Sequence, residues 1–211
     1  MPDKEIVLAT GNPGKLREIK QVLTELPVNV IGLDELSDIA EPDETGDTFA
    51  QNAREKALYY AQATGRWCLA DDSGLQVDAL NGAPGVHSAR YSGDAIPPGS
   101  PREDVDRANN AKLLEALKDT PDEQRTARFI CSLAMARPGE ILLETSGAFN
   151  GVIARSNSGE NGFGYDPLFF VPAHGCTAAE LPPKEKNAIS HRGRAVRRFA
   201  ELLNDFLATE K

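Results

Sequence analysis

The stretch IVLATGNPGKLREIKQVL, residues 6–23, decides the fold because a strand, a turn and a helix follow one another in it. Its first four residues form a short apolar run that is typical of a buried strand. Asn12 and Pro13 then supply a helix-capping residue and a proline suited to the first helical position. The apolar residues after this turn recur with helical spacing at Leu16, Ile19, Val22, Leu23 and Leu26.

The following chain alternates helices and strands before it turns to a hairpin. Thr48 and Gln51 form a capping box at the start of one helix, and Arg137-Pro138-Gly139 suits a hairpin turn between two long strands. The expected strands cover 28–31, 67–70, 126–136 and 140–149, and the expected helices cover 48–63, 102–118 and the residues from 190 onward. This order predicts an α/β fold with a mixed sheet flanked by helices.

Three segments are expected to be loops. They are 34–47, which is acidic, 79–101, which is rich in Gly, Pro and Ser, and 156–167. A loop as long as the second usually serves function or mobility. The helix at 102–118 should bury an amphipathic stripe made of Val105, Ala108, Ala111, Leu114 and Leu117.

Size and charge limit the classes of partner. The 211 residues suit one domain or two closely joined lobes, and the composition, 40% hydrophobic and 26% charged, is that of an ordinary globular protein. A formal net charge of -9 disfavours nucleic acid or an anionic membrane as the main partner, because neutralising phosphates needs a basic surface. A small phosphorylated ligand is compatible with it, since a few local cations or N–H groups can hold one.

The three cysteines, Cys68, Cys131 and Cys176, are odd in number and show no Cys-x-x-Cys spacing, so neither a disulfide framework nor a zinc site is indicated. Cys68 and Cys131 lie in apolar runs and are expected to be core residues. The first residues show no signal-peptide pattern, and the longest apolar stretch, 129–136, is too short to cross a bilayer. We therefore expect a soluble cytoplasmic protein.

Asp71 and Asp72 follow the apolar run at 67–70 and lead into Ser73-Gly74, which we expect to form a tight turn. Such a stretch alone is more often a solvated turn or a helix cap than a functional site. Two adjacent carboxylates, however, raise each other's pKa unless a cation lies between them. The pair therefore suggests a cation site.

Glu44, ahead of the helix expected at 48–63, could add an oxygen ligand to Asp71 or Asp72, although alone it reads as a solvated loop charge. Magnesium suits such a sparse acidic set, because proteins hold it with one or two carboxylates, waters and substrate phosphates. The sequence has no His/Cys cluster that would suggest a transition metal.

The turn at 10–14, followed by Lys15, could bind an anion. It is not a Walker A motif, because Ala9 and Leu16 stand where that motif needs glycine and a hydroxyl residue. Backbone N–H groups at a helix N-terminus bind anions nevertheless, and Lys15 could lean over them. A lone turn of this kind is more often only a capped helix.

Two further segments could hold the rest of a nucleotide. Phe163 lies between two glycines in the segment 162–167, which clears space for stacking on a flat base, although a plain hairpin turn has the same composition. Ser190-His191-Arg192, with Lys184 and Lys186 nearby, places cations at a helix N-terminus against the macrodipole. Such cations suggest a role in holding an anion or a base carbonyl.

Taken together, these motifs closely resemble the inosine triphosphate pyrophosphatase family, from the first strand to the last helix and in the same order. Four separate motifs in sequence are far more specific than any one of them, and the match includes a further segment in the long loop. The matching segments are Thr10-x-Asn12-x-x-Lys15-x-x-Glu18, Asp71-Asp72-Ser73-Gly74-Leu75, Ala89-Arg90-Tyr91-Ser92-Gly93, Gly162 to Pro167 and Ser190-His191-Arg192.

The resemblance implies a two-lobed α/β fold around a long mixed sheet, with an active-site cleft between the lobes, and a homodimer. It also implies magnesium-dependent hydrolysis of ITP, dITP and XTP to the monophosphate and pyrophosphate, which removes these nucleotides from the cellular pool. Triphosphate cleavage asks mainly for positioning and charge stabilisation, so the absence of an obvious covalent nucleophile does not count against this activity.

The resemblance further implies roles for individual residues. Asp72 would accept the proton of the attacking water, and Glu44 and Asp72 would hold Mg²⁺, with Asp71 as a further candidate ligand. The residues expected to contact substrate are Thr10, Gly11, Asn12, Pro13, Gly14, Lys15, Ser73, Phe163, Gly164, Tyr165, Asp166, Lys186, His191 and Arg192.

Base selectivity would follow from hydrogen-bond donors. Arg192 and a backbone N–H can only donate, so they suit the 6-carbonyl of hypoxanthine or xanthine and leave the 6-amino group of adenine unpaired. Two alternatives stay open: a pyrophosphatase for other modified nucleoside triphosphates, and a nucleotide-sensing module that binds without hydrolysis. The Asp71-Asp72 pair disfavours the nucleotide-sensing module, because carboxylates that face phosphates contribute little to a protein that only binds the nucleotide.

Overall fold

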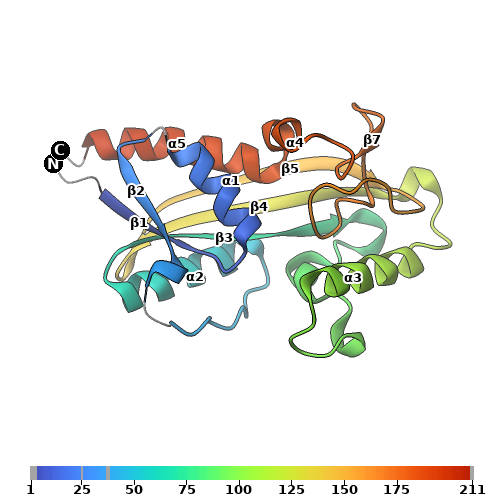
Figure 1. Cartoon of the computed structure of the whole chain (residues 1–211), viewed down its shortest axis with the longest axis horizontal. Helices are drawn as coiled ribbons and strands as arrows, with labels where there is room; N and C mark the ends of the chain where they lie inside the picture. Colours follow the sequence, from blue (N-terminus) through green and yellow to red (C-terminus); the bar gives the residue numbers. More distant parts are fainter. Residues whose placement is uncertain (1–3, 25, 37–38, 210–211) are drawn as a thin grey trace. The chain divides into compact units, whose positions relative to one another are not determined.

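The computed structural model describes residues 4–24, 26–36 and 39–209, and in these ranges the strands form one seven-stranded sheet of order β2-β1-β3-β4-β5-β6-β7 (Figure 1). β1 runs parallel to β2 and to β3, whereas β6 runs antiparallel to β5 and to β7. The strands are β1 (Lys4–Ala9), β2 (Val28–Gly32), β3 (Trp67–Val77), β4 (Thr126–Arg137), β5 (Glu140–Ile153), β6 (Phe169–Val171) and β7 (Cys176–Thr177). The α-helices are α1 (Pro13–Leu23), α2 (Phe49–Thr64), α3 (Arg102–Ala116), α4 (Pro183–Ile189) and α5 (His191–Thr209). The predicted mixed α/β fold is confirmed.

The chain divides into two compact units. The first unit comprises residues up to Asp72 together with Cys131–Gly147 and the residues from His191 onward. The second unit comprises Ser73–Ile130 and Ala148–Ser190. Each of the strands β3, β4 and β5 contributes residues to both units, and a further crossing lies between α4 and α5, at Ser190 and His191.

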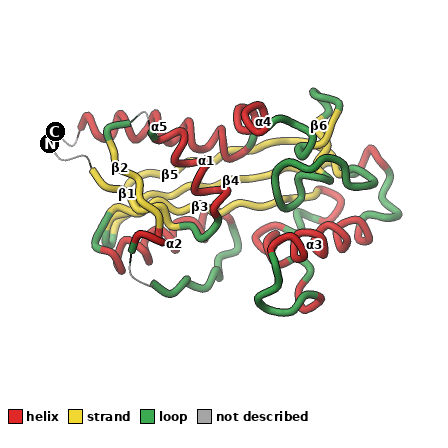
Figure 2. The backbone as a smooth tube through the Cα atoms, viewed as in Figure 1, coloured by secondary structure: helices red, strands yellow, loops and turns green. Residues whose placement is uncertain are grey.

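The first unit covers both faces of its strands with helices. Because side chains alternate along a strand, Ile6 and Leu8 pack with α1 and α5, whereas Val7 and Ala9 pack with α2. Figure 2 shows the same arrangement, with α1 and α5 on one side of β1 and β3 and α2 on the other. This layering explains the uninterrupted apolar run that the sequence shows in β1.

The helix starts predicted for α1 and α2 are confirmed. The Asn12 side chain accepts hydrogen bonds from the backbone N–H groups of Gly14 and Lys15, and Pro13 is the first residue of α1. The Thr48 hydroxyl accepts from the N–H of Gln51 at the start of α2. The apolar side of α2 is buried, and it consists of Phe49, Ala53, Ala57, Tyr60 and Ala61.

The second unit has its own core between α3 and the strands. Phe169 lies at its centre, with its ring 4.5 Å from that of Phe129 and 5.2 Å from that of Phe149. Leu75 and Leu113 are fully buried in the same cluster.

The buried stripe predicted for α3 is partly wrong. Ala111, which the helical spacing placed inside, is exposed, and Asn109 and Asn110 are buried together with Leu113 and Leu117. The asparagines can be buried because their amides bond the backbone of neighbouring loops. Apolar spacing could not reveal this, because polar residues occupy part of the inner face.

Several element boundaries also differ from the predictions. Residues 79–101 contain 3₁₀ turns at Gly85–Arg90 and Gly93–Ala95. α4 and the short strands β6 and β7 were not predicted, and Ser190, expected to begin the last helix, instead ends α4. The loop predicted at 34–47 begins inside a 3₁₀ turn, and its residues 37–38 lie outside the described ranges.

The remaining sequence expectations concern cysteines and membranes. Cys68 and Cys131 are fully buried, as expected for core residues, and no disulfide links the three cysteines, all of which lie in the described ranges. Among the described residues, no helix combines the length and apolar character needed to span a membrane. The first three residues, on which the signal-peptide prediction partly depends, are not among those described.

Candidate active site

Asp71 and Asp72 lie inside a strand and not before a turn, because β3 continues through Ser73-Gly74 to Val77. The predicted tight turn is therefore wrong. Successive side chains of a strand point to opposite faces of the sheet. Asp71 accordingly contacts residues of α1 and α5, whereas Asp72 contacts residues of α2. The two carboxylates therefore have different hydrogen-bond and ion-pair partners, although the charge of Lys15 acts on both.

The Asp71 cluster is a buried set of charges in the first unit. The Asp71 side chain is fully buried and forms ion pairs with Lys15 and with Arg192, whose Nε lies 3.3 Å from Oδ2. The Cys131 thiol also donates to this oxygen, over 3.1 Å. Burial alone would raise the pKa of Asp71, but Lys15 and Arg192 outweigh it and hold this pKa well below its ordinary value. Asp71 is therefore ionised and already balanced by protein cations.

Arg192, predicted to contact the nucleotide, is buried and bonded to two acids. The residue is 4% exposed, and its Nη1 atom donates to Glu18 over 2.6 Å while Nε faces Asp71. Burial lowers its pKa, but the two carboxylates outweigh burial and raise this pKa above its ordinary value. Two acids of the first unit therefore hold this guanidinium in the structure.

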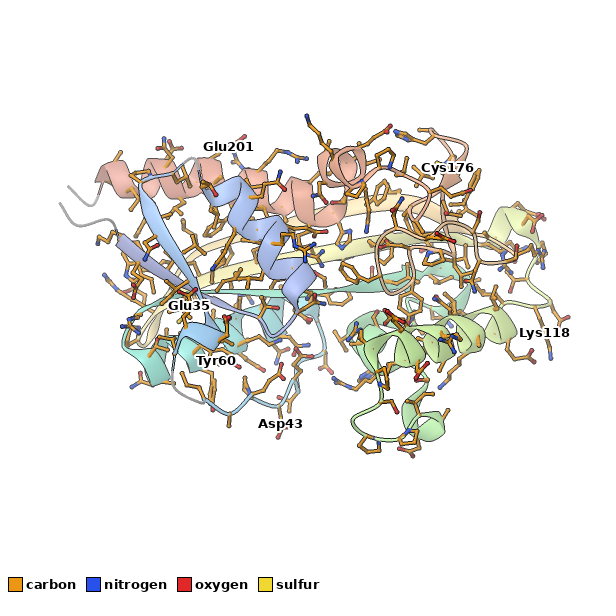
Figure 3. The ribbon with its side chains drawn as sticks, viewed as in Figure 1. Glu35, Asp43, Tyr60, Lys118, Cys176 and Glu201 are labelled. Atoms are coloured by element: carbon orange, nitrogen blue, oxygen red, sulfur yellow. The ribbon has the colours of Figure 1, made fainter. Side chains whose placement is uncertain are left out.

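Asp72 belongs to the carboxylate cluster, which consists of Glu44, Asn52, Lys56 and Asp72. The Asn52 amide donates to Asp72 over 3.0 Å, and its carbonyl oxygen accepts from the N–H of Gly46 over 2.8 Å. Asn52 thereby ties the loop that carries Glu44 to β3. Figure 3 shows Asp43, the neighbour of Glu44, on this loop as it leads to α2.

The charges of the carboxylate cluster shift two pKa values. Burial and then the nearby Glu44 carboxylate raise the pKa of Asp72 to about 6. Lys56 forms an ion pair with Glu44, and this carboxylate outweighs burial and raises the pKa of Lys56 above its ordinary value. A buried carboxyl that titrates near neutrality is suited to exchange a proton with substrate or water.

The oxygen donors of the carboxylate cluster suit Mg²⁺, which also binds substrate and water, better than a metal that needs a complete set of protein ligands. Among the described residues, no group of three or more His, Cys, Asp and Glu side chains is placed to hold a metal. Glu44 and Asp72 are instead two oxygen donors that repel each other, and Mg²⁺ is usually held by one or two carboxylates with substrate phosphates and water. Asp71, predicted as a further candidate ligand, is committed to Lys15 and Arg192 and does not belong to this set.

The turn before α1 is largely bonded to itself. The N–H groups of Gly14 and Lys15 donate to Asn12, and the N–H of Asn12 donates to the Thr10 hydroxyl over 3.2 Å. Gly11 is exposed at the tip of the turn. The turn is pre-shaped, and an anion would have to replace some of these bonds or bind at the tip.

The aromatic loop, residues 162–167, is part of the second unit. Gly162 and Gly164 flank Phe163 with φ angles of 81° and 64°, values that L side chains rarely adopt. The Asp166 carboxylate accepts from the N–H of Phe163 over 2.8 Å and pairs with Lys186 over 2.5 Å. The Lys186 ammonium lies 5.2 Å from the centre of the half-buried Phe163 ring. Lys186 and Asp166 thus hold the loop beside the ring.

Three more predicted substrate contacts have different environments. Tyr165 is buried, and its hydroxyl donates to the carbonyl of Ser88 over 2.8 Å, so this phenol supports the loop from within. His191 is buried at the first position of α5. Ser73 is half-buried in β3, directly after Asp72. The structure brings Phe163, Asp166 and Lys186 together, and it brings Lys15 and Arg192 to Asp71.

A family model described as the Ham1 family matches residues 6–202. The chain belongs to the Ham1 family. This finding confirms the resemblance inferred from the motifs.

Curated relatives cover this Ham1-family chain almost completely. A dITP/XTP pyrophosphatase of Geobacter sulfurreducens is 51% identical over 202 residues, which are 96% of each chain. A dITP/XTP pyrophosphatase of Desulforamulus reducens is 48% identical over 95% of this chain and 96% of its own. The solved structure of a HAM1 protein from Coxiella burnetii superposes with a TM-score of 0.85 at 44% identity, covering 96% of this chain and 99% of that protein.

Sequence reasoning missed several polar residues of this Ham1-family chain. Asn52 and Lys56 face the carboxylates from α2, four residues apart on one helix face. Asp106 and Asn110, also four apart, bond the aromatic loop from α3. Both pairs could have been found from the sequence, because each consists of polar residues at helical spacing on a helix face that is otherwise apolar and buried.

Proposed function

We propose that this protein hydrolyses noncanonical purine nucleoside triphosphates, namely dITP, ITP and XTP, to the monophosphate and pyrophosphate. This reaction removes such nucleotides from the pool used for nucleic acid synthesis. Curated relatives of nearly equal length that are named dITP/XTP pyrophosphatase support this function. The structural observation that carries it is the buried Asp72 beside Glu44, with a pKa raised to about 6.

We assign Asp72 as the general base. With a pKa near 6, its carboxylate is mostly ionised at neutral pH yet basic enough to take a proton from an attacking water at its Oδ atoms. Asn52, which donates to Oδ2, keeps the carboxylate in one orientation. Replacement by asparagine would preserve the shape and remove the base.

We propose Mg²⁺ as the cofactor, with Glu44 and Asp72 as its protein ligands. When bound, the ion would neutralise phosphate charge and help to orient the attacked phosphoryl group. Lys56 forms an ion pair with Glu44 and also lowers the pKa of Asp72, so a protein cation already offsets part of the charge that the ion would neutralise. Lys15 and the turn at 10–14 would contact phosphate oxygens from α1.

We assign base recognition to the aromatic loop and Lys186. The face of Phe163 would stack on the purine, a contact that tolerates every base. Selectivity would come from donors, because a 6-carbonyl accepts hydrogen bonds and a 6-amino group does not. Since Arg192 is held by Asp71 and Glu18, Lys186 and backbone N–H groups of the loop are the better donors.

We also propose that the protein acts as a homodimer in the cytoplasm and binds neither nucleic acid nor membranes. The family resemblance supports the dimer, and the net charge of -9 supports the lack of a polyanionic partner. Light scattering coupled to size exclusion would test the dimer, which should show twice the 22.7 kDa chain mass.

A substrate panel tests the function. Purified protein is incubated with ITP, dITP, XTP, GTP and ATP, each with Mg²⁺ and with excess EDTA, and pyrophosphate release is measured. We expect release from the first three, at least about tenfold slower release from ATP, and none with EDTA, since one mismatched buried group costs roughly tenfold or more.

Other results would favour the alternatives. Tight binding of ITP without release would indicate a binding module, and faster release from a modified pyrimidine triphosphate would indicate another substrate class. Equal rates on ATP and ITP would contradict the proposed selectivity. Activity that survives EDTA would contradict the proposed cofactor.

A further inference from the structure

Two side chains of α3 hold the same glycine of the aromatic loop. The N–H of Gly164 donates to Asp106 Oδ2 over 2.8 Å. The Asn110 amide donates to the carbonyl of Gly164 over 2.9 Å. Asp106 and Asn110 are four residues apart and therefore project from one face of the helix. Both polar groups of one loop residue are thus bonded to a single rigid element of the second unit.

These contacts are sheltered from water. Asn110 is 4% exposed, and the side chain of Asp106 is 14% exposed. Arg102, one turn earlier, lies 3.0 Å from the other carboxylate oxygen of Asp106 and forms an ion pair with it. Hydrogen bonds to a charged acceptor are stronger than neutral ones, and buried bonds are not exchanged easily for water.

The hydrogen bond to the N–H of Gly164 helps to determine the orientation of Phe163. The N–H of Phe163 donates to Asp166, and the N–H of Gly164 donates to Asp106. The two peptide planes on either side of the Phe163 Cα atom are therefore both fixed. Because φ and ψ are the only soft backbone torsions of a residue, fixing these planes sets the direction in which the Phe163 side chain leaves the backbone.

The backbone of Gly164 would not stay in this shape unaided. Its φ of 64° is one of several conformations that glycine visits with similar ease. A glycine therefore gives the loop its shape but also leaves it free to change. The bonds from Asp106 and Asn110 select one conformation of this flexible residue.

We infer that Asp106 and Asn110 are positioning residues that orient Phe163 for stacking on the purine base. They touch the loop and not the substrate, so their effect on the reaction passes through Phe163. The inference rests on the proposed function, in which Phe163 binds the base. It predicts that these two residues set base affinity and leave phosphate binding unchanged.

The neighbouring Asn109 provides a matched control. It is the same residue type on the same helix and is 2% exposed, but it bonds a different segment. Its side chain accepts from the N–H of Ser92 over 2.6 Å and donates to the carbonyls of Ser88 and Ala89. Asn109→Ala should therefore cost stability as Asn110→Ala does, without the same effect on base affinity.

The test compares Asp106→Ala, Asn110→Ala, Asp106→Asn and Asn109→Ala with the unmodified enzyme, using dITP and Mg²⁺. Losing one buried hydrogen bond changes an equilibrium by about two- to tenfold. We expect KM to rise about three- to tenfold in the first two variants while kcat changes less than about twofold. Asp106→Asn keeps an oxygen that can accept from Gly164 and should restore most of the affinity.

A base-free probe separates orientation of the loop from general damage. Inorganic tripolyphosphate competes through its phosphates alone, so its inhibition constant should be the same in the unmodified enzyme and in Asn110→Ala. The double variant Phe163→Ala/Asn110→Ala should bind dITP no more than about twofold worse than Phe163→Ala, because residues that act through one another are not additive.

The inference is overturned if KM for dITP stays unchanged in both alanine variants, or if Asn109→Ala raises it equally. A parallel rise in the tripolyphosphate inhibition constant, or full additivity with Phe163→Ala, also overturns it. Failure of the unmodified enzyme to hydrolyse dITP would instead refute the proposed function, so the two failures can be distinguished.

Discussion

The carboxylate cluster of the first unit and the aromatic loop of the second unit are built in opposite ways. Asp72 lies on β3 and Asn52 lies on α2, so regular elements hold both residues. Burial and a nearby charge set the pKa of Asp72. Phe163 lies between two glycines in a loop, and its position depends on hydrogen bonds to the backbone. A strand holds Asp72, the group that must titrate, and a loop holds the surface that must fit.

This difference predicts how substitutions act. In the carboxylate cluster they change charge and pKa, so they should alter kcat or the unfolding free energy. In the aromatic loop they change contact area and orientation, so they should alter KM. The two regions can therefore be separated by kinetic measurements alone.

The largest expected effect is that of Asp72→Asn. The asparagine keeps the size of the side chain and an oxygen that can accept from Asn52, but it cannot take a proton from water. We expect kcat to fall by about 10³-fold, within the range that general bases contribute. Pyrophosphate release from dITP measures the loss, and calorimetric titration with dITP should show binding within about threefold of the unmodified protein.

A smaller loss of rate would break the comparison. If Asp72→Asn retained more than a tenth of kcat, the carboxylate would not be the base. If instead the variant bound dITP poorly but kept its kcat at saturating substrate, the carboxylate cluster would serve substrate binding, as the aromatic loop does.

The next largest effect concerns stability. Asp71→Asn removes the buried partner of Lys15 and leaves Arg192 paired with Glu18, and breaking a buried ion pair usually costs about 3–5 kcal/mol. Urea unfolding should show a loss of this order at unchanged m-value. Asp78→Asn is the control, since Asp78 pairs with Arg128 at the surface and should lose less than about 1 kcal/mol. Equal losses in both variants would show that the Asp71 cluster is not a buried network.

The regular parts of the first unit could be predicted from the sequence. The strand, turn and helix of residues 6–23 follow from local patterns, because capping and apolar period act over a few residues. The end of β3 could not be predicted the same way. Two acids and a glycine are turn signals in water, and only Lys15 and Arg192, which are distant in sequence, make the acid at 71 tolerable inside a strand.

The sequence named candidate site residues but could not give most of their contacts. Glu44 and Asp72 were expected together and do interact. The sequence could not show that Arg192 pairs with Asp71 across 121 positions, or that the Tyr165 hydroxyl bonds Ser88. Such pairings depend on which strand faces which helix, and local periodicity carries no information about that.

A third prediction concerns pH and metal. The folded-state pKa of Asp72 is about 6 against an ordinary value of 3.8, so the folded protein binds this proton more tightly than the unfolded chain. The stabilisation from this group is complete below pH 3.8 and is lost as pH rises to about 6. In EDTA at pH 7.5, Asp72→Asn should therefore be about 1–3 kcal/mol more stable than the unmodified protein, and at pH 4 this advantage should vanish.

Adding Mg²⁺ sharpens this measurement. An ion that binds only the folded state raises stability by mass action. At pH 7.5, Mg²⁺ should raise the thermal midpoint of the unmodified protein and leave that of Asp72→Asn almost unchanged. A stability advantage of Asp72→Asn that persists at pH 4 would mean that the side chain acts by packing and not by its charge.

The smallest expected effect is that of Phe163→Ala, and it tests the other side of the comparison. Stacking of a base on an aromatic ring contributes about 1–3 kcal/mol, so KM for ITP, dITP and XTP should rise about tenfold. Phe163→Tyr keeps a flat face and should stay within about threefold, whereas Phe163→Leu keeps apolar bulk without the face and should resemble alanine. Because the loop takes no part in proton transfer, kcat should change less than about threefold in all three. A fall in kcat as large as that of Asp72→Asn would show that the loop also positions the reacting phosphate, and the division between a chemical region and a binding region would fail.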